Sequence, residues 1–394
     1  MRSGPPTGAP SPCRRASAPA RIPSRWRPAG QTNVGTKPLS QRALNRALLE
    51  RQWLLRRRSA PVPDAIEHLC GMQAQVPTSP YVGLWARLYD FHPQALEDLI
   101  TTRRAVRLAL MRSTIHLVTA RDCLRLRPLF QAFLERALHT ATPFGRQMVG
   151  IDLTVLVAAA RKALDERPRT LAELGTVLHQ RWPDRDPASL AYAVRHLVPL
   201  VQVPPRGLWG RSGAAWCATA ETWLGRPLQA RPSLEKLILR YLAAFGPASV
   251  GDIQAWSGLR TLRPIVDRLR PQLRSLTDAG GRELLDVPDG VLPDPDTPAP
   301  PRFLPEYDNL LLAHADRTRV VSDQHRSVIG FRTLLVDGLV RATWTVARQP
   351  AAATLTVECL TPLRKVERTA VEKEGTRLLA FVAPQATRRE IRFV

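Results

Sequence analysis

Apolar residues at helical spacing dominate the chain beyond its first forty residues. Behind Ser40, a favourable N-cap, the recurrence of Leu44 and Leu48 predicts a first helix. The same spacing predicts further short helices, followed by two β-rich runs that form a hairpin. These segments are expected over 62–73, 78–90, 92–103, 105–112 and 114–119. Helices followed by a hairpin are the plan of a winged helix-turn-helix.

The same order of patterns occurs twice more. In the second round, Thr170 and Glu173 form a capping box, and Asp186 precedes a proline at the start of a helix. Each round ends in an alternating segment around glycines, typical of a wing hairpin. The segments are 152–166, 170–183, 186–200 and 201–219, then 233–249, 250–259, 261–273 and 273–288. Any α-rich chain can be divided into groups of three helices and a hairpin. Here each of three hairpins follows its own group of helices, which favours a repeat of architecture.

A proline-rich connector over 288–303 ends the helical part of the chain. Beyond it, alternating segments at 333–348, 352–363 and 375–384 predict strands, with a helix at 363–375. The predicted fold class is α+β, with tandem winged helix-turn-helix units followed by a small antiparallel β domain. The expected parts are a disordered basic tail at 1–37, winged-helix units at 38–145, 146–228 and 229–299, and a β domain at 300–394.

Charge indicates the partner. The 394 residues include 57 Lys and Arg against 34 Asp and Glu, a net charge of +23. Nearly all the positive charge is arginine, which makes bidentate contacts to phosphate. A GC-rich genome explains arginine in place of lysine, but it does not explain the surplus of positive charge. That surplus favours double-stranded DNA as the partner, and no apolar run is long enough to predict a membrane span.

The sequence lacks the motifs of cofactor chemistry. It contains no phosphate-binding G-x-x-x-x-G-K-[ST] loop, no dinucleotide-binding G-x-G-x-x-G, no G-x-S-x-G elbow and no H-E-x-x-H. Its five cysteines stand singly, which argues against a disulfide framework and a zinc site. We therefore expect no metal and no nucleotide cofactor. We also expect a cytoplasmic, nucleoid-associated protein that is a monomer.

The stretch CGMQAQVPTSPY, residues 70–81, sets Gln73 and Gln75 on either side of an alanine. Glutamines beside a turn usually bond backbone groups and orient a loop. Here they fall between two predicted helices of the first winged unit, flanked by Met72 and Val76, in a strongly basic chain. This placement makes both glutamines candidate catalytic residues.

The stretch LCGMQAQVPTSPYVGLWARL resembles the Q-φ-Q region (φ apolar) of the AlkZ-like winged-helix DNA glycosylases, relatives of the YcaQ proteins. The stretches RSTIHLVTARD, VPLVQVPPRGLWGRSG and FLPEYDNLLLAHADRTRV resemble further characteristic blocks of that family. The likeness runs from about residue 40 to residue 394. The YcaQ branch carries an aspartate at the second glutamine position, so Gln75 places this chain with the AlkZ branch.

This resemblance implies a DNA glycosylase that hydrolyses the N-glycosidic bond of alkylated purines, of the N7-alkylguanine type, and unhooks interstrand crosslinks. Gln73 and Gln75 correspond to the catalytic pair. Neutral amides suit this chemistry because an alkylated purine is a cationic leaving group, so the protein needs only a positioned water and an oxygen near the developing sugar cation. No lysine lies near the motif in sequence, which predicts a monofunctional enzyme without a Schiff base. Because a crosslinked base is tethered to the other strand, we expect an open cleft in place of a base-flipping pocket.

Two other interpretations stay open. The first is a non-catalytic winged-helix DNA-binding protein, such as a transcriptional regulator. A regulator would more often be a short dimer with one recognition helix per subunit, so the tandem units and the glutamine pair favour the enzyme. The second is the same activity in a narrower role, protecting a producer of DNA-alkylating compounds.

Seven residues outside the motif are candidate DNA contacts. In the first wing we expect Arg112 on a phosphate and His116 near the lesion or strand backbone, with internal packing of Thr114 and His116 as an equal alternative. For the block around 308–319, an internal cluster of hydrogen bonds and ion pairs is as strong an alternative, because Asp and Arg alternate there. The remaining candidates are Arg206, Arg211, Arg317 and Arg319.

Overall fold

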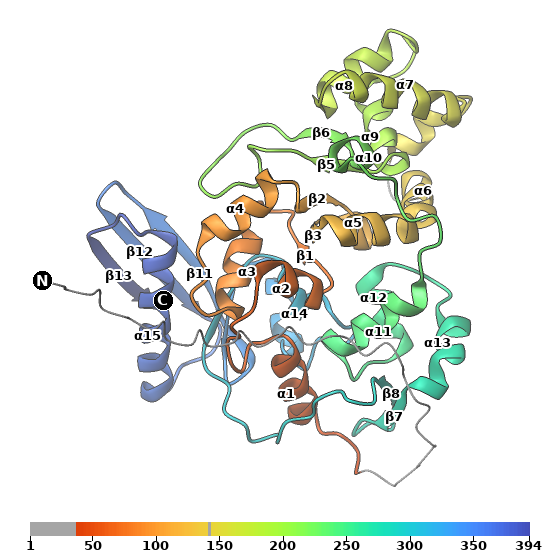
Figure 1. Ribbon diagram of the computed structural model, residues 1–394. Helices are drawn as coiled ribbons and strands as arrows, with labels where there is room; N and C mark the ends of the chain where they lie inside the picture. The colour runs from red at the N-terminus through yellow and green to blue at the C-terminus, as the bar shows by residue number, and fades with distance from the viewer. Residues whose placement is uncertain (1–36, 141–142) are drawn as a thin grey trace, which may run out of the picture.

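A computed structural model describes residues 37–140 and 143–394 (Figure 1). The tail predicted to be disordered therefore lies, except for Lys37, outside the described residues. No helix among the described residues combines the length and the apolar character needed to cross a membrane.

The first winged unit follows the order helix, short strand, two helices, hairpin. A preceding helix, α1 (Gln41–Arg51), is capped by Ser40 as predicted. The helix predicted over 62–73 is wrong in its second half, because Cys70 and Gly71 take positive φ angles of 55° and 87° that end it. The chain then extends, so Gln73 lies in a strand. The unit consists of α2 (Val62–His68), β1 (Met72–Gln73), α3 (Ser79–Arg87), α4 (Pro93–Thr101), β2 (Ala105–Ala109) and β3 (Ile115–Thr119).

The second unit repeats this order. Its predicted capping box at Thr170 and Glu173 is present, and Asp186 caps the following helix. The unit consists of α7 (Leu153–Glu166), β4 (Arg169–Thr170), α8 (Leu171–His179), α9 (Pro187–Leu197), β5 (Leu200–Gln202) and β6 (Trp216–Thr219). Before it lie α5 (Ala120–Leu126) and α6 (Gln131–Thr140), and after it α10 (Ala220–Leu224).

The third unit has the same plan, with an isolated bridge between Ala248 and Leu285 in place of the short strand. Its elements are α11 (Leu234–Phe245), α12 (Val250–Ser257), α13 (Arg263–Leu269), β7 (Arg274–Thr277) and β8 (Glu283–Asp286). The predicted α+β class with tandem winged-helix units is confirmed, while the exact unit boundaries stay a prediction.

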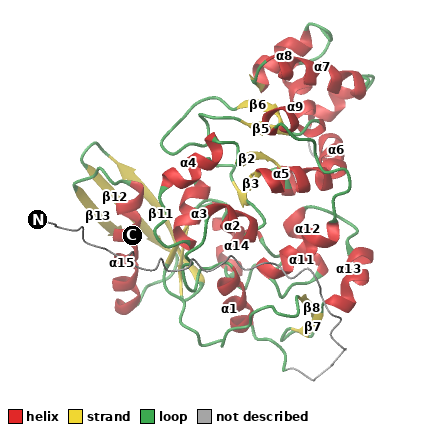
Figure 2. Ribbon diagram, in the orientation of Figure 1, coloured by secondary structure: helices red, strands yellow, loops and turns green. Residues whose placement is uncertain are grey.

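The wings of the first two units merge into one sheet, which the sequence did not predict. Its strand order is β1-β3-β2-β5-β6-β4, and the join between the units is the antiparallel pairing of Arg107 with Gln202 and Leu108 with Val201 (Figure 2). The predicted hairpin of the second wing is present, and its glycines lie in a long loop over 203–215. The second unit also has a hydrophobic core of its own, separate from the large core of the rest of the chain.

The C-terminal domain is a five-stranded sheet in the order β13-β12-β11-β10-β9, antiparallel as predicted except between β12 and β13. The strand predicted over 375–384 is wrong, because this segment continues helix α15. Val371, Leu378 and Val382 are buried at helical spacing, which places this face of α15 against the sheet. Strand β13, which follows, pairs parallel to β12. The elements are β9 (Arg302–Leu304), α14 (Asn309–Leu312), β10 (Thr333–Val336), β11 (Leu339–Arg348), β12 (Ala352–Cys359), α15 (Lys365–Val382) and β13 (Arg388–Phe393).

A buried ion pair joins the C-terminal domain to the first winged unit. Both carboxylate oxygens of Asp308 accept hydrogen bonds from Arg87 in α3, at 2.7 and 2.9 Å. The two side chains are 2% and 1% exposed, so neither charge has water to replace its partner. Asp308 also caps α14 by accepting from the Leu310 backbone N–H at 3.0 Å. The pair therefore fixes the start of α14 against α3.

Removing one partner of this pair should unfold the protein more easily. We expect Asp308→Ala to lower the free energy of unfolding by about 3–5 kcal/mol, because it leaves the buried guanidinium of Arg87 without a counter-charge. Urea titration followed by circular dichroism measures this change. As a matched control, Glu372→Ala removes an exposed partner of Arg368 and should change the free energy by at most about 0.5 kcal/mol. Equal losses in the two variants would contradict the assignment.

Candidate active site

Gln73 lies in the short strand at the start of the first winged unit. Strand β1 pairs antiparallel with β3, with Gln73 opposite His116. Gly71 makes this pairing possible, because a Cβ at its position would lie 2.7 Å from Val118 Cγ1. The C-terminal domain supports the strand from its other side: the side chain of Asn309 accepts from the Gln73 N–H at 3.3 Å and donates to the carbonyls of Leu69 and Gly71, at 3.2 and 2.6 Å.

The side chain of Gln73 is held by a half-buried guanidinium. Its Oε1 accepts a hydrogen bond from Arg112 Nη2 at 2.7 Å, and Arg112 Nη1 donates to the carbonyl of Trp256 in α12. Because only the oxygen of an amide can accept, this contact fixes which way the amide group points. Two of the five N–H groups of Arg112 are thereby directed to acceptors inside the protein, and the phosphate contact of this half-buried residue stays a prediction.

The turn that carries Arg112 has a strained backbone. Arg112 and Ser113 both have positive φ angles, 54° and 58°, a region that costs a non-glycine residue about 1–2 kcal/mol. The turn is packed from two sides. Ser113 Oγ lies 3.2 Å from His196 Nε2 of α9, and a Cβ at Gly258, after α12, would lie 3.2 Å from the Arg112 nitrogen. All three winged units therefore meet at this turn, and the contacts hold it in its conformation.

Gln75 is exposed, unlike Gln73, which is 7% exposed. Its Oε1 accepts from the backbone N–H of Ile115 at 3.2 Å. Gln75 lines a cavity of about 120 Å³ whose other walls come from the first and second units. Among the described residues, the buried Oε1 of Gln202, on this wall, has no hydrogen-bond partner. The lining residues are Gln75, Ala109, Ile115, Leu171, Arg195, Leu200, Gln202, Ala215 and Cys217.

Positive charge is concentrated behind Gln73. Burial, followed by the charge of Arg317, lowers the pKa of Arg112 to about 10. Arg317 is itself half-buried, and burial lowers its pKa too. The carboxylate of Asp308 shares a small cavity with Gln73, but both its oxygens are bound to Arg87. The site therefore presents neutral amides in front of guanidinium groups, with the neighbouring carboxylate already paired.

Of the other two predicted DNA contacts in the first wing, His116 packs inside the protein and Thr114 is half-buried. His116 is 1% exposed, and its Nδ1 lies 3.0 Å from the carbonyl of Thr114. Burial, together with the charge of Arg112, lowers the pKa of His116 to about 3, so the imidazole is neutral. Thr114 Oγ1 donates to the carbonyl of Met111 at 3.1 Å. The structure shows the alternative of internal packing for His116, while the DNA contact of Thr114 stays a prediction.

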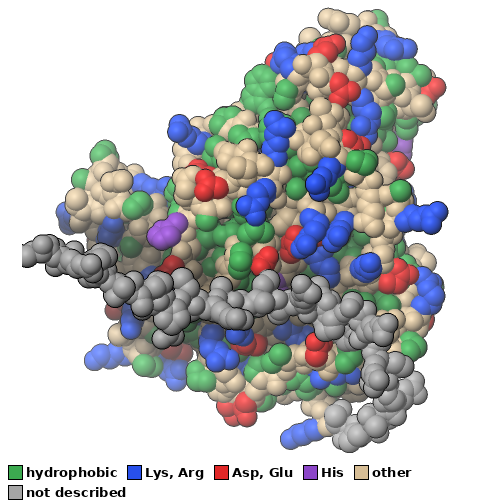
Figure 3. Space-filling view, viewed as in Figure 1, with side chains coloured by type: hydrophobic (Ala, Val, Ile, Leu, Met, Phe, Trp, Pro, Cys, Tyr) green, Lys and Arg blue, Asp and Glu red, His purple; other side chains and the backbone are tan. Residues whose placement is uncertain are grey.

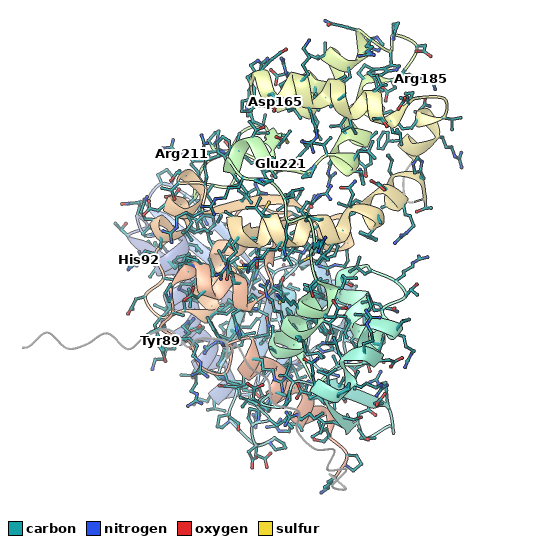
Figure 4. The ribbon with its side chains drawn as sticks, turned by 45° about the vertical axis from the view of Figure 1, so that its right-hand side comes forward. Tyr89, His92, Asp165, Arg185, Arg211 and Glu221 are labelled. Atoms are coloured by element: carbon teal, nitrogen blue, oxygen red, sulfur yellow. The ribbon has the colours of Figure 1, made fainter. Side chains whose placement is uncertain are left out.

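The four remaining candidates separate into surface and interior. Arg319 is 4% exposed and donates to the carbonyl of Pro247 at 2.8 Å, so the structure shows the internal alternative for this residue in place of a DNA contact. Arg206 donates to the carbonyl of Gly213 at 2.8 Å, within the loop over 203–215. Arg211 is exposed on the same loop, at the periphery of the molecule in Figure 4. The structure thus brings Arg317 near enough for its charge to act on Arg112, and leaves Arg206 and Arg211 on the loop of the second wing.

Sequence reasoning missed the residues that come to the site from other units. Trp256 and His196 lie 144 and 83 residues from their partners in the first wing. The sequence pattern shows Gln202 only as part of a strand. No local pattern marks these residues, because their role depends on how the three units pack.

Comparisons with known proteins agree with this architecture. A family model described as "DNA glycosylase AlkZ-like" matches residues 66–381. Among solved structures, Streptomyces sahachiroi DNA glycosylase AlkZ is similar, with a TM-score of 0.72 and 20% sequence identity, over 91% of this chain and 100% of that chain. At that identity the structural likeness shows the fold. No curated protein sequence matches the chain.

Acidification should destabilise the protein through His116. Its pKa is about 3 when folded and 6.5 in the reference state, so between these values the unfolded chain binds a proton that the folded protein does not. This contribution to stability is complete above pH 6.5 and declines toward pH 3, by at most about 1.4 kcal/mol per pH unit. Urea unfolding of the wild type and His116→Gln across this range measures the difference in slope.

The exposed His92 (Figure 4) provides the matched control, because His92→Gln should keep the wild-type slope. The slope for His116→Gln should be flatter. Identical pH slopes in all three proteins would show that His116 does not stay neutral in the folded state.

Proposed function

This chain belongs to the DNA glycosylase AlkZ-like family, and we propose that it hydrolyses the N-glycosidic bond of alkylated purines through Gln73 and Gln75. One observation carries the proposal: both side-chain amides are fixed by the same short segment. Arg112 holds the oxygen of Gln73, and the Ile115 N–H holds the oxygen of Gln75. Two neutral amides are thereby pre-positioned at the junction of the winged units, where the exposed side of Gln75 is open to a ligand.

The contacts of the two glutamines support a different task for each. A carbonyl oxygen has two lone pairs, so each amide oxygen keeps one free. The oxygen of Gln73 bonds a cation and is therefore the poorer acceptor. The oxygen of Gln75 bonds a neutral N–H, and its side chain is exposed. We assign Gln75 to hold the attacking water and Gln73 to place its amide beside the sugar, with Arg112 as its positioning residue.

An amide is a weak base, which restricts the reaction to activated substrates. Alkylation at N7 gives the purine a positive charge, so the base leaves without a strong nucleophile and the transition state resembles an oxocarbenium ion. A positioned water and one well-aimed polar group then supply about 3–4 kcal/mol of transition-state stabilisation. Unmodified purines lack the cationic leaving group and would remain intact.

The shape of the site supports action on bulky and crosslinked lesions. The cavity beside Gln75 measures about 120 Å³, below the range of about 300–1,000 Å³ typical of small-molecule pockets. A crosslinked purine stays tethered to the opposite strand, so it cannot be withdrawn into an enclosed pocket. An exposed Gln75 can act on a base that remains in the duplex. We therefore include the unhooking of interstrand crosslinks in the proposed activity.

The site supports a monofunctional reaction on duplex DNA. A Schiff base with the sugar would require an amine nucleophile. The five lysines are Lys37, Lys162, Lys236, Lys365 and Lys373, none of which lies in β1, β3 or α12. We propose that the enzyme leaves an abasic site, acts as a monomer on chromosomal DNA, and contacts phosphates through Arg206, Arg211 and Arg317. Borohydride should trap no covalent complex with lesion-bearing DNA, and a trapped complex would establish a lyase step.

Replacement of the glutamines should abolish the chemistry and leave binding intact. We expect Gln75→Ala to slow single-turnover excision of N7-methylguanine by about 100-fold to 1,000-fold, because it removes the acceptor for the water. Gln73→Ala and Arg112→Ala should also slow it, since the amide of Gln73 is then absent or unheld. Excision is measured as alkali-labile strand cleavage, and duplex affinity by fluorescence anisotropy.

The exposed Gln94 of α4, which bonds Asp98, provides a matched control, and Gln94→Ala should excise at the wild-type rate. Wild-type rates in both Gln73→Ala and Gln75→Ala would reject the assigned chemistry. DNA binding by a wild-type protein that excises nothing would support the alternative of a non-catalytic DNA-binding protein.

A further inference from the structure

A large basic groove lies at the end of the β2–β3 hairpin opposite to Arg112. Its volume is about 940 Å³, and its walls come from the residues before β2, from α5, from α10 and from the start of α11. Seven of the lining residues are cationic, and no Asp or Glu lines the groove. Figure 3 shows Lys and Arg side chains gathered over α5 and between it and α11. The cations are Arg103, Arg104, Arg121, Arg125, Arg226, Lys236 and Arg240.

Most of this charge is uncompensated. Arg240 pairs with Asp122 at 2.6 Å, and Arg121 pairs with Glu67. The other five cations have no carboxylate within 4.0 Å in the part of the chain that the structure describes. Like charges that face one concavity repel one another, and the binding of a polyanion removes that repulsion. The groove is therefore electrostatically suited to several phosphates at once.

One wall of the groove is ordered by an aromatic ring. The guanidinium of Arg103 lies 4.1 Å from the ring centroid of Trp223, and its Nη1 donates to the Trp223 carbonyl at 3.2 Å. A cation–π contact holds the charge in place without neutralising it. This preorganisation leaves the remaining N–H groups of Arg103 available for a phosphate oxygen.

The groove is separate from the glutamine site. One end of the hairpin is closed by the bond from the Ala120 N–H to the Arg104 carbonyl at 2.8 Å, and the other by the bond from Leu110 to Thr114 at 3.1 Å. The five-residue strands between these ends span about 16 Å, at about 3.3 Å per residue. That length corresponds to about five base pairs of duplex DNA.

We propose that this groove binds the phosphodiester backbone of duplex DNA outside the lesion, as a second contact surface that the glutamine site does not provide. The inference stands apart from the catalytic assignment, because it requires only that the protein binds DNA. The groove would hold this protein on undamaged duplex DNA. On damaged DNA it would bind the strand that flanks the lesion.

The test removes charge from the groove without disturbing its walls. Arg104, Arg125 and Arg226 are exposed, and no hydrogen bond of their side chains occurs among the described residues. In the full-length protein, the triple variant Arg104→Gln, Arg125→Gln, Arg226→Gln should bind undamaged duplex more weakly. Its slope of log K against log salt should fall by about 0.9 for each phosphate that the protein no longer neutralises, or about two to three in all. Fluorescence anisotropy over a salt series measures both quantities.

The matched control removes the same charge elsewhere. Lys365, Lys373 and Arg388 are exposed in the C-terminal domain, and changing all three to Gln should keep the wild-type salt slope. Equal slopes in the two triple variants would overturn the proposal. So would a loss of affinity for single-stranded RNA, or for inorganic pyrophosphate as a competitor, with the affinity for duplex DNA unchanged.

The two proposals fail in distinguishable ways. The groove variant should keep the wild-type single-turnover excision rate at saturating enzyme, whereas the glutamine variants lose that rate and keep the salt slope. A duplex that extends fewer than about five base pairs beyond the lesion should bind the wild type and the groove variant equally. A groove variant with wild-type slope on long duplexes would overturn the second surface even where the glutamines prove catalytic.

Discussion

The position of the candidate catalytic strand depends on the buried contact between Arg87 and the segment Asp308–Asn309. Asp308 is bound on both oxygens by Arg87, and the next residue, Asn309, bonds the backbone on both sides of the turn that leads into β1. A two-residue strand makes too few ladder bonds to define its own place. A segment more than 200 residues away in the chain therefore supplies the rigidity that the site requires.

The site itself lies where separate structural units converge. The first unit provides both glutamines, the third provides the carbonyl that receives Arg112, and the second provides the contacts to Ser113. The left-handed turn at Arg112 and Ser113 is unfavourable in isolation, and this packing keeps it in place. A tandem array achieves what one winged helix would not, because a single unit has no neighbours to fix such a turn.

Sequence patterns predicted the features that depend on neighbouring residues in the chain. Helical spacing, the capping residues Ser40, Thr170 and Asp186, and the glycine-rich wings place most elements of the three units correctly. The segment 375–384 was mistaken for a strand because a short apolar run fits both periods. The merged sheet and the internal acceptors of Arg112 and Arg319 escaped prediction for a different reason. Their partners lie 144 and 72 residues away, and the sequence carries no signal of that proximity.

The charge of the groups around the glutamine pair changes little with pH, because His116 is neutral. Amides do not titrate, arginine keeps its proton, and an imidazole with a pKa of about 3 stays uncharged above mild acidity. These groups around the glutamine pair therefore keep one charge state between about pH 5 and 9. The positive charge that distinguishes a damaged base is then set by the DNA alone. Such an enzyme distinguishes damaged from undamaged bases by the charge of the lesion. The charges of the protein around the glutamine pair stay constant over this pH range.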